Sequence, residues 1–590
     1  MAYRAPLDDL LFAMRRAAGE SAFAPGGLYD DCDAETARAT LAEAAKFAEG
    51  VLLPLDRIGD REGLRFAGGE VTTAPGWRDA YRQWVEGGWN ALAAGPAHGG
   101  MGLPLLLAAA CTEIWNAANI SFALCPLLGQ GAIEAMEAHA SEALKAVYLP
   151  KMISGEWTAT MNLTEPQAGS DLALLRTRAE RVGDGSYRLT GQKIFITYGE
   201  HDLSENILHF VLARLPDAPP GTRGISLFLA PKFLPDADGR PGERNDLRCA
   251  GVERKLGIHA APTCTMAYGD NGGARAFLVG EENAGLACMF TMMNNARLSV
   301  GLQGVALAER ATQAALAYAR ERLQGRAPGG PDPSPIVAHP DVARMLLTMK
   351  AQTAAARAIS FLTAASLDRA RRQSGEAARE AEERAGLLTP LAKAYSTDIG
   401  VETASLGVQV HGGMGFIEET GAAQLLRDAR ITPIYEGTNG IQAIDLVTRK
   451  LRLSDGAAIW REIDDMRADL DALAGGGVVF VHIGERAAAA VEAFERATDF
   501  LFSIGEPRGV DALSAATPYL KLFGLARGAT LLGAAALAAQ RAGDAAAEEK
   551  TVLARFFGDN IAGGAEGLER AGVAGGDSIA AALPLLAARN

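Results

Sequence analysis

The residue best suited to acid–base chemistry is a glutamate in a short segment that contains turn-forming residues. Glu436 stands between Tyr435 and Gly437 in the segment RITPIYEGTNGIQ, which covers residues 430–442. A carboxylate shielded from water can take a proton from a weak carbon acid, whereas a carboxylate in a hydrated loop is an ordinary surface charge. Taken alone, the segment fits both interpretations.

Two other segments gather small and polar residues. MNLTEPQAGSD, residues 161–171, is a hydroxyl-rich loop in which Pro166 fixes a turn. QVHGGMGF, residues 409–416, contains three glycines, and glycines of this kind bind a dinucleotide when they follow a strand of a βαβ unit. No such strand precedes them, so a simple tight turn is the alternative.

Motifs for other common chemistries are missing. The sequence has no GxxxxGK[ST], no HExxH and no GxSxG. The eight histidines lack metal-ligand spacing, and the six cysteines lack CxxC spacing, so neither a zinc site nor a disulfide framework is predicted.

The elements that must position these segments begin with helices. Asp33 is placed to cap a helix through ETARATLAEAAKFAEGVLLPL, and further helical patterns cover residues 77–89 and 104–139. Residues 105–128 are apolar nearly all round, which predicts a buried helix.

After Gly155 the pattern changes to short runs of branched and aromatic residues. These runs cover residues 187–197, 207–215 and 225–233, and they predict a small antiparallel sheet or barrel. Residues 235–248 are predicted to be a loop by composition.

Helical patterns return at Gly285 and continue to the end of the sequence. Because βαβ alternation is missing, a doubly wound fold is disfavoured. The expected class is α+β, mainly α, with an N-terminal helical domain, a middle β-barrel or sheet domain, a C-terminal helical bundle and an additional C-terminal helical domain. The expected divisions are 1–33 (an N-terminal extension), 34–158, 159–282, 283–452 and 453–590.

Composition and charge exclude several classes of protein. With 590 residues, of which 48% are hydrophobic and 22% charged, the chain exceeds one compact core and is not disordered in bulk. A net charge of −14 without a basic block disfavours nucleic acid as a partner. The first ten residues lack the apolar core of a signal peptide, and the longest apolar stretch, residues 528–539, is about half a membrane span. We expect a soluble, cytoplasmic protein without membrane partners.

The three segments together resemble the acyl-CoA dehydrogenase family of flavoproteins. TEPQAGSD, QVHGGMG and IYEGT occur in the family's order along a helix–sheet–helix layout, over about residues 35–450. ERKLGIHAAPTC, MMNNARLSVGLQG and the extra C-terminal helices resemble the long branch of the family, which includes 3-methylmercaptopropionyl-CoA dehydrogenase and broad-range fatty acyl-CoA dehydrogenases. The resemblance implies FAD-dependent α,β-dehydrogenation of an acyl-CoA thioester to the trans-2-enoyl-CoA, with electron-transfer flavoprotein as the electron acceptor.

The resemblance assigns the chemistry to one residue. Glu436 is implied to remove the α-proton while the flavin takes a β-hydride. The backbone N–H of Glu436 and a flavin ribityl hydroxyl are implied to hold the thioester oxygen, as an oxyanion site does.

The same resemblance implies contacts to the flavin ring. Met161, Thr164 and Ser170 of the hydroxyl-rich loop are implied to contact one side of the ring. Phe195 and Thr197 are implied to flank its other side. Phe195 has the alternative of being a residue of the sheet core. Met161 and Phe195 stand where many relatives carry Tyr and Trp, so stacking and redox tuning are expected to differ.

A further set is implied to contact the dinucleotide, in part across a subunit interface. Arg322 and Gln324 match positions that reach the pyrophosphate, although an ordinary exposed arginine at a helix end is the alternative for Arg322. Gln409 and Gly413 match positions at the adenosine end. Thr438 and Gly440, which follow the base, complete this set. Gly440 stands where several relatives carry Gln.

For CoA, the best match is Arg297 with Asn294 one turn earlier, and Ser170 is implied to touch the pantetheine. Arg297 has the alternative of a structural ion pair. A shared flavin site implies a homo-oligomer, and the extra C-terminal helices favour a dimer.

Three alternatives keep the same fold. An acyl-CoA oxidase would let oxygen reoxidise the flavin, and a DNA-binding stress protein would need a basic stripe after Leu453, where no dense basic cluster occurs. The intact IYEGT argues against a catalytically silent scaffold. The acyl group stays open among 3-methylmercaptopropionyl, short straight-chain and longer groups.

Overall fold

The computed structural model describes residues 3–588, which group into two units. The helical unit comprises residues 3–41, Leu105–Glu113 and 300–588, and the mixed unit comprises Ala42–Pro104 and Ile114–Ser299. We describe each unit by itself. The fold class predicted from the sequence, α+β and mainly α, is confirmed.

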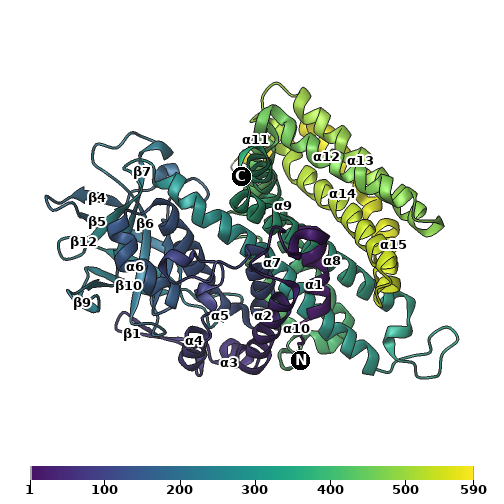
Figure 1. The fold of residues 1–590 in the computed structure, drawn as a ribbon, viewed down its shortest axis with the longest axis horizontal. Helices are drawn as coiled ribbons and strands as arrows, with labels where there is room; N and C mark the ends of the chain where they lie inside the picture. Colours follow the sequence, from purple (N-terminus) through teal and green to yellow (C-terminus); the bar gives the residue numbers. More distant parts are fainter. Residues whose placement is uncertain (1–2, 589–590) are drawn as a thin grey trace. The chain divides into compact units, whose positions relative to one another are not determined.

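Helices make up most of the helical unit, and the mixed unit combines helices with strands (Figure 1). In chain order they are α1 (Leu7–Ala18), α2 (Ala34–Phe47), α3 (Leu53–Glu62), α4 (Trp77–Glu86), α5 (Leu105–His139), α6 (Glu142–Ser154), α7 (Gly285–Glu321), α8 (Pro340–Arg372), α9 (Gly375–His411), α10 (Ala422–Ala429), α11 (Asn439–Thr448), α12 (Ala457–Ala474), α13 (Val478–Ser503), α14 (Val510–Ala542), α15 (Ala547–Asn560), α16 (Ala565–Ala574) and α17 (Gly576–Ala587).

The strands all lie in the mixed unit. They are β1 (Arg65–Ala67), β2 (Glu70–Thr72), β3 (Trp157–Asn162), β4 (Arg178–Arg181), β5 (Tyr187–Thr197), β6 (Asn206–Arg214), β7 (Ile225–Pro231), β8 (Phe233–Pro235), β9 (Pro241–Arg244), β10 (Leu247–Val252), β11 (Thr263–Tyr268) and β12 (Ala274–Val279).

Polar side chains set the start of two helices. The Asp33 carboxylate accepts a hydrogen bond from the N–H of Thr36 at 2.7 Å, so the predicted cap of α2 is confirmed. In the helical unit, the N–H groups of Leu105 and Leu106 donate to the Asp368 carboxylate at 2.8 and 2.9 Å. A carboxylate from α8 therefore caps the first turn of α5.

The main sheet has the strand order β10-β11-β5-β12-β7-β6-β3, and β4 pairs with β5 and β6. Most pairs are antiparallel, as predicted, but β3 and β4 each run parallel to β6. The predicted loop at residues 235–248 is wrong in part, because β9 pairs with β8 and β10 begins at Leu247. Strand pairing rather than residue preference decides the structure of that segment.

Two apolar clusters cover the sheet of the mixed unit. One joins α5, α6 and the start of α7 to β3, β6 and β7, and it includes the buried side chains of Trp157, Phe210 and Met289. The other lies among β5, β10, β11 and β12 and includes Leu189 and Met266. Apolar side chains therefore pack on both faces of the sheet. This packing sets the register of the strands, and with it the position of the strand ends that carry the residues predicted to contact the flavin.

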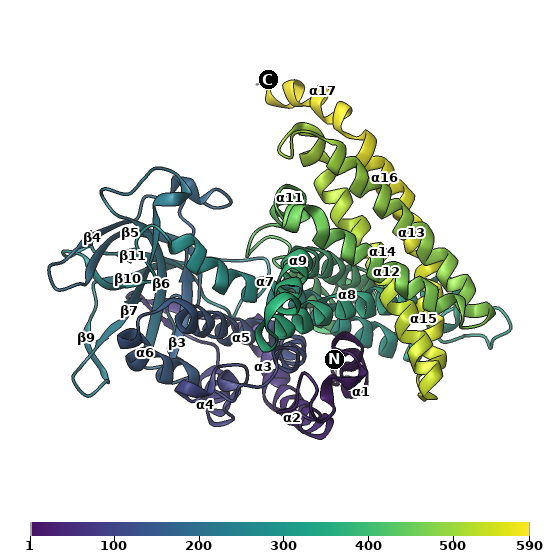
Figure 2. The same ribbon diagram turned by 45° about the horizontal axis from the view of Figure 1, so that its top comes forward.

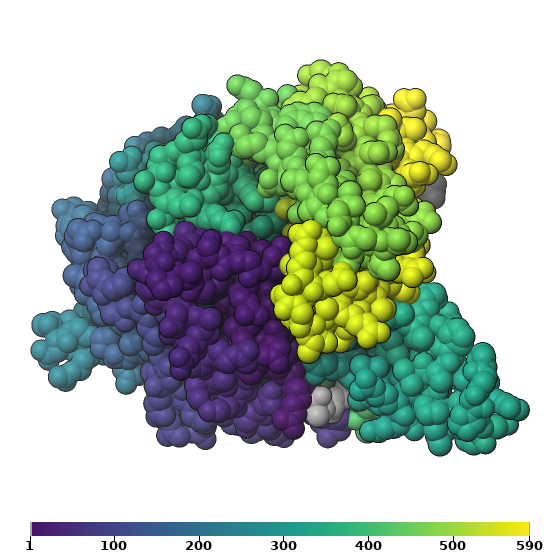
Figure 3. Space-filling model, turned by 45° about the vertical axis from the view of Figure 1, so that its right-hand side comes forward, coloured from purple at the N-terminus to yellow at the C-terminus, as the bar shows by residue number. Residues whose placement is uncertain are grey.

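The helical unit packs α8 against α9, and α14 packs on both (Figure 2). Figure 3 shows α15, in yellow, beside the purple N-terminal segment, and Lys550 of α15 donates to Asp9 of α1 at 2.9 Å. Within residues 3–588, α5 and α14 are long and apolar enough to span a membrane. However, 94% and 72% of their apolar windows are buried inside the structure.

Candidate active site

Glu436 lies in a closed loop of the helical unit between α10 and α11. The N–H of Asn439 donates to the carbonyl of Pro433 at 3.0 Å, and we call residues 433–439 the base loop. Gln442 Nε2 donates to the carbonyl oxygens of Glu436 and Gly437 at 3.4 and 3.3 Å. Both of these residues have left-handed backbones, with φ of 55° and 83°, which is uncommon for a residue other than glycine.

The residues on either side of this glutamate anchor the base loop. The Tyr435 hydroxyl donates to Oε1 of Gln303 on α7, a fully buried side chain. Burial, with the neighbouring carboxylate as a smaller cause, raises the pKa of Tyr435 far above its ordinary value. Thr438 caps α11 through its hydroxyl at 3.3 Å, and Gly440 is exposed in the first turn of that helix.

The predicted dinucleotide residues lie at two chain segments that meet in the helical unit. Arg322 and Gln324 follow the end of α7, and Gln409 and Gly413 lie at the end of α9. The rings of Tyr318 and His411 stack there with centroids 4.6 Å apart, which joins the two helix ends. All four predicted residues are exposed. In the described residues, the side chains of Arg322, Gln324 and Gln409 make no hydrogen bond or ion pair.

The predicted ring contacts come together in the mixed unit. Met161 is on β3, and the N–H of Ile194 on β5 donates to the carbonyl of Thr164 at 2.9 Å. Thr160 Oγ1 donates to the carbonyl of Thr197 at 2.6 Å, so the end of β5 lies beside β3. Ser170 lies further along the same loop and is exposed.

Phe195 is not a residue of the sheet core. Its side chain is 59% exposed and its φ is 59°, which turns the backbone out of the regular strand. The core alternative raised by the sequence is therefore wrong. Across residues 3–588, the hydroxyls of Thr164, Ser170 and Thr197 have no hydrogen-bond partner, so this strand edge offers polar groups and an aromatic ring to a ligand.

A buried ion pair supports the hydroxyl-rich loop. Lys193 Nζ donates to Glu165 Oε1 at 2.8 Å and to the carbonyl of Leu163 at 2.9 Å. Burial opposes the charge on Glu165, but Lys193, the Thr177 hydroxyl and the backbone N–H of Arg176 outweigh it and lower the pKa of Glu165 to about 2. Burial lowers the pKa of Lys193 to about 8, although Glu165 offsets part of that effect.

The two residues predicted to contact CoA lie together on α7. Arg297 is 6% exposed, and its Nη1 donates to Asn294 Oδ1 at 3.3 Å. Its guanidinium lies 5.7 Å from the centre of the Phe290 ring. The structure therefore brings Arg297 and Asn294 into contact, in the mixed unit, while Glu436 and the dinucleotide residues belong to the helical unit.

Three supporting residues have roles that the sequence alone does not reveal. Asn439 follows the IYEGT motif, Glu165 lies inside TEPQAGSD, and Lys193 precedes Phe195. All three lie within or beside a recognised segment. That position in the chain is the only feature of the sequence that could have indicated their roles. Their partners, which the fold supplies, define their roles.

Metal chemistry finds no support among residues 3–588, where no group of three or more His, Cys, Asp or Glu side chains has metal-binding geometry. His201 and His209 are buried and hydrogen-bonded to Thr158 and Tyr268, as expected for core histidines.

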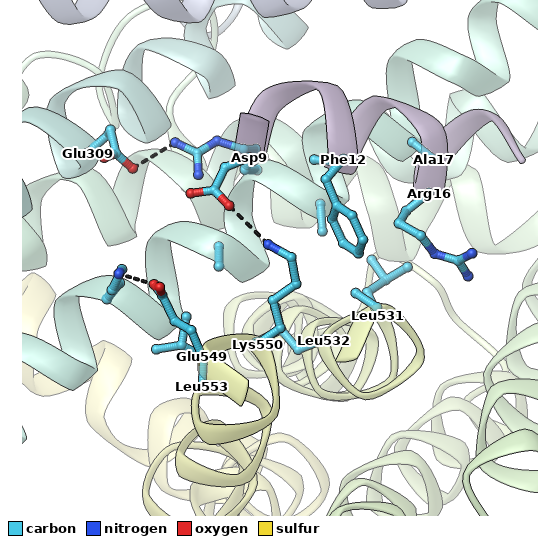
Figure 4. A pocket seen from close by; sticks show the side chains of 16 residues that line it. Asp9, Phe12, Arg16, Ala17, Glu309, Leu531, Leu532, Glu549, Lys550 and Leu553 are labelled. Atoms are coloured by element: carbon cyan, nitrogen blue, oxygen red, sulfur yellow. Dashed lines mark hydrogen bonds and ion pairs between the residues drawn. The ribbon is translucent and has the colours of Figure 1, made fainter. Parts of the chain in front are cut away.

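A cavity of about 120 Å³ lies elsewhere in the helical unit, where α1, α8, α14 and α15 meet (Figure 4). Lys550 reaches across it between the Asp9 carboxylate and the Phe12 ring, and its ammonium is 4.3 Å from the ring centre. None of the predicted site residues lines this cavity. It is separate from the base loop and the predicted flavin contacts.

Family models match successive parts of the chain. They describe the acyl-CoA dehydrogenase N-terminal domain (residues 34–156), middle domain (160–270) and C-terminal domain (283–451), and an acetyl-CoA dehydrogenase C-terminal-like domain (461–583).

Relatives and solved structures agree with these matches. A 3-methylmercaptopropionyl-CoA dehydrogenase of Ruegeria pomeroyi is 50% identical over 506 residues, 85% of each chain. The Caenorhabditis elegans protein ACDH-11, solved in complex with C11-CoA, is 20% identical with a TM-score of 0.78, and the match covers 95% of this chain and 91% of that one. A Bacillus anthracis acyl-CoA dehydrogenase, solved with FAD, is 20% identical with a TM-score of 0.76 over 98% and 95% of the two chains.

Proposed function

This chain belongs to the acyl-CoA dehydrogenase family, and we propose that Glu436 is the base with which it removes the α-proton of an acyl-CoA thioester. As a member of that family it is an oxidoreductase that dehydrogenates acyl-CoA. The base, the cofactor contacts and the acyl group belong to the proposal.

The observation that carries the proposal is the backbone of Glu436. A left-handed conformation at a residue other than glycine costs roughly 1–3 kcal/mol and persists only where the surroundings impose it. Here the hydrogen bond from Asn439 to Pro433 and the two from Gln442 impose it. A carboxylate held by such a loop is oriented before substrate arrives, which is what proton abstraction from carbon requires.

FAD is the cofactor, and it supplies the group that accepts a hydride from the β-carbon when bound. The unpartnered hydroxyls of Thr164, Ser170 and Thr197 and the exposed ring of Phe195 suit the polar edge and face of a flavin, and the buried Met161 is proposed to contact the ring as well. Glu436 takes the α-proton, and its backbone N–H is proposed to donate to the thioester oxygen, where negative charge develops.

The dinucleotide end of FAD is assigned to the exposed polar residues of the helical unit. A guanidinium suits a pyrophosphate because it offers several N–H donors in one plane, and the amide of Gln324 adds a further donor beside Arg322. The other members of the set are Gln409, Gly413, Thr438 and Gly440. We propose that Arg322, Gln324, Gln409 and Gly413 contact the FAD of a neighbouring subunit. The working enzyme would then be a homodimer.

The substrate we propose is 3-methylmercaptopropionyl-CoA or a short- to medium-chain fatty acyl-CoA. The support is the 50% identity with the Ruegeria pomeroyi enzyme over 85% of both chains. Arg297 with Asn294 is proposed to hold CoA, and Ser170 to touch the pantetheine. We further propose electron-transfer flavoprotein as the acceptor, a cytoplasmic location on the basis of composition, and the division into domains at residues 34, 159, 283 and 453.

An anaerobic titration tests the base and the acyl group together. The purified, FAD-loaded protein is mixed with a panel of acyl-CoA thioesters, and the loss of the flavin's yellow absorbance is followed. We expect bleaching by the preferred thioester, and in Glu436→Gln a rate lower by several orders of magnitude with FAD still bound. Glu548→Gln, an exposed glutamate of α15, is the matched control and should bleach at the wild-type rate. Bleaching of Glu436→Gln at the wild-type rate would show that another group is the base.

The acceptor is tested after bleaching. Reduced enzyme is mixed either with electron-transfer flavoprotein or with air-saturated buffer, and the return of the flavin absorbance is timed. We expect fast return with the flavoprotein and slow return with oxygen. The opposite order would identify an oxidase.

A further inference from the structure

The base loop is attached to α9 through the side chain of Asn439. Its Oδ1 accepts a hydrogen bond from Lys393 Nζ at 2.8 Å. The Thr397 hydroxyl lies 3.2 Å from the same oxygen and 3.0 Å from Nδ2 of the amide. Its Nδ2 donates to the carbonyl of Ala394 at 3.0 Å and to Asp398 Oδ1 at 2.7 Å. Four groups of one helix therefore hold a single amide.

We call these four groups of α9 the clamp, and together they fix which way round the amide of Asn439 lies. An amide oxygen can only accept hydrogen bonds and an amide nitrogen can only donate them, and both atoms of this amide have partners of the matching kind. An ammonium faces the oxygen, whereas a carbonyl and a carboxylate face the nitrogen. Lys393 and Thr397 are fully buried, so water cannot replace a lost partner at either residue. No other side chain of this size matches the same set of groups.

The same residue also closes the base loop. The backbone N–H of Asn439 donates to Pro433, three residues before Glu436, while Asn439 itself is three residues after it. We propose that Asn439 is the positioning residue for the base, because its side chain fixes the loop to α9 and its backbone fixes the loop's closure. This inference rests on the proposed role of Glu436.

The first test compares rate with binding in the full-length, FAD-loaded enzyme. Asn439→Ala removes the clamp but keeps the backbone N–H. We expect the maximal bleaching rate to fall about 100-fold, the size of effect that a small misplacement of a reacting group produces. FAD content and the half-saturating acyl-CoA concentration should change by less than about threefold, since no proposed CoA contact is touched. Asn560→Ala, an exposed asparagine at the end of α15, should keep the wild-type rate. A wild-type rate in Asn439→Ala would overturn the inference.

A double-variant comparison asks whether Asn439 acts through the glutamate. Glu436→Asp shortens the base by one methylene group and leaves it misplaced whether or not the clamp is intact. If Asn439 acts by placing the carboxylate, Asn439→Ala should lower the rate much less in the Glu436→Asp background than in the wild type. The same fold-loss in both backgrounds would mean that Asn439 acts elsewhere, and the inference would fall.

Asn439→Asp provides the test if the alanine variant does not fold. At neutral pH its carboxylate would face Asp398 and the Ala394 carbonyl, whereas protonation restores one donor on that side. Its bleaching rate relative to wild type should therefore rise as pH falls from 8 to 6, and a ratio independent of pH would contradict the clamp. If no acyl-CoA bleaches the wild type, the proposed function itself fails. If the wild type bleaches, Glu436→Gln does not, and an Asn439 variant bleaches normally, only this inference fails.

Discussion

The pair of Lys193 and Glu165 shows how one buried residue can hold a functional segment. Their side chains are 0% and 3% exposed, and a buried ion pair alone adds little stability because both charges lose their water. Here the carboxylate also accepts from the Thr177 hydroxyl at 2.6 Å, and the ammonium donates to a carbonyl of the hydroxyl-rich loop. The pair therefore specifies where that loop lies.

Stability should depend on the ionisation of Glu165 at acid pH. Its pKa is about 2 in the folded protein, below the ordinary value of 4.5, so the extra stability is complete above pH 4.5 and is lost as pH falls toward 2. A shift of that size corresponds to at most about 3 kcal/mol. The measurement is urea unfolding between pH 6 and pH 3 of wild type and of the double variant Glu165→Gln, Lys193→Met.

We expect the wild type to lose stability more steeply than the double variant below pH 4.5. The remaining carboxylates are common to both proteins, so the difference between the two curves isolates this pair. Parallel curves would contradict the assignment.

The roles of individual residues could be predicted from the sequence only where a recognised motif contained them. Glu436 was found through IYEGT, but Lys193 falls on the same face of the alternating strand YRLTGQKIFIT as Tyr187 and Leu189, and the strand pattern does not show which carboxylate its charge would meet there. Asn439 looks like an ordinary helix-start residue, and its partners are 41 to 46 residues away in the chain. Such roles depend on contacts between distant segments, which periodicity does not encode.

At the scale of elements, α7 and α9 approach so closely that glycine is required between them. A Cβ on Gly304 would lie 2.2 Å from the carbonyl oxygen of Ser396, and a Cβ on Gly400 would lie 2.8 Å from the Gly304 backbone. The clamp on Asn439 comes from the same stretch of α9. Helix spacing and the placing of the base loop are therefore linked.

Gly304→Ala should destabilise the protein, because the new methyl group meets backbone that cannot rotate away. We expect a loss of about 1–3 kcal/mol or more in the free energy of unfolding, with a lower bleaching rate in the folded fraction. Gly567→Ala is the matched control: this glycine of α16 is exposed with nothing within 4 Å of the added Cβ. That substitution should be neutral or stabilising by up to about 1 kcal/mol. Urea unfolding that showed equal stabilities for the two variants would contradict the close approach.

Elements with a clear pattern were predicted to within about three residues, as for α4, which was predicted at residues 77–89 and ends at Glu86. The strand predicted at residues 187–197 coincides with β5, because branched and apolar residues alternate along it. β9 was missed because PGER has almost no strand preference and forms only by pairing with β8. The parallel pairing of β3 with β6 was equally beyond a pattern that is local to each strand.

At the scale of the whole molecule, the C-terminal helices are part of the core of the helical unit. Glu462 of α12 lies between two arginines, 2.8 Å from Arg384 of α9 and 2.7 Å from Arg527 of α14. Glu462 and Arg527 are almost fully buried. A buried charge without its partner is costly, so these helices are expected to fold together with α9 rather than as a separate addition.

The proposed dimer makes its own prediction about the surface. Phe416 is 85% exposed, and it lies just after Gly413 in the segment assigned to a partner's FAD. Met414 and Ile417 beside it are also exposed apolar residues, and Leu323 at the end of α7 is a fourth. Apolar side chains gathered at one site on a surface mark a contact with another protein. We therefore expect this group to be covered by the second subunit.

Phe416→Ser should weaken that contact, since truncating a central aromatic side chain at an interface commonly costs about 2 kcal/mol or more, roughly 30-fold in the dimer dissociation constant. Light scattering after gel filtration at micromolar concentration should give twice the chain mass of 61.7 kDa for the wild type and a lower average mass, with less bound FAD, for the variant. Leu585→Ser in α17 alters a residue that is 78% exposed but lies far along the chain from the proposed cofactor residues, so it should leave both mass and FAD content unchanged. If Leu585→Ser dissociates the dimer and Phe416→Ser does not, the subunits meet through the C-terminal helix, and the proposal that they share the flavin site loses its support.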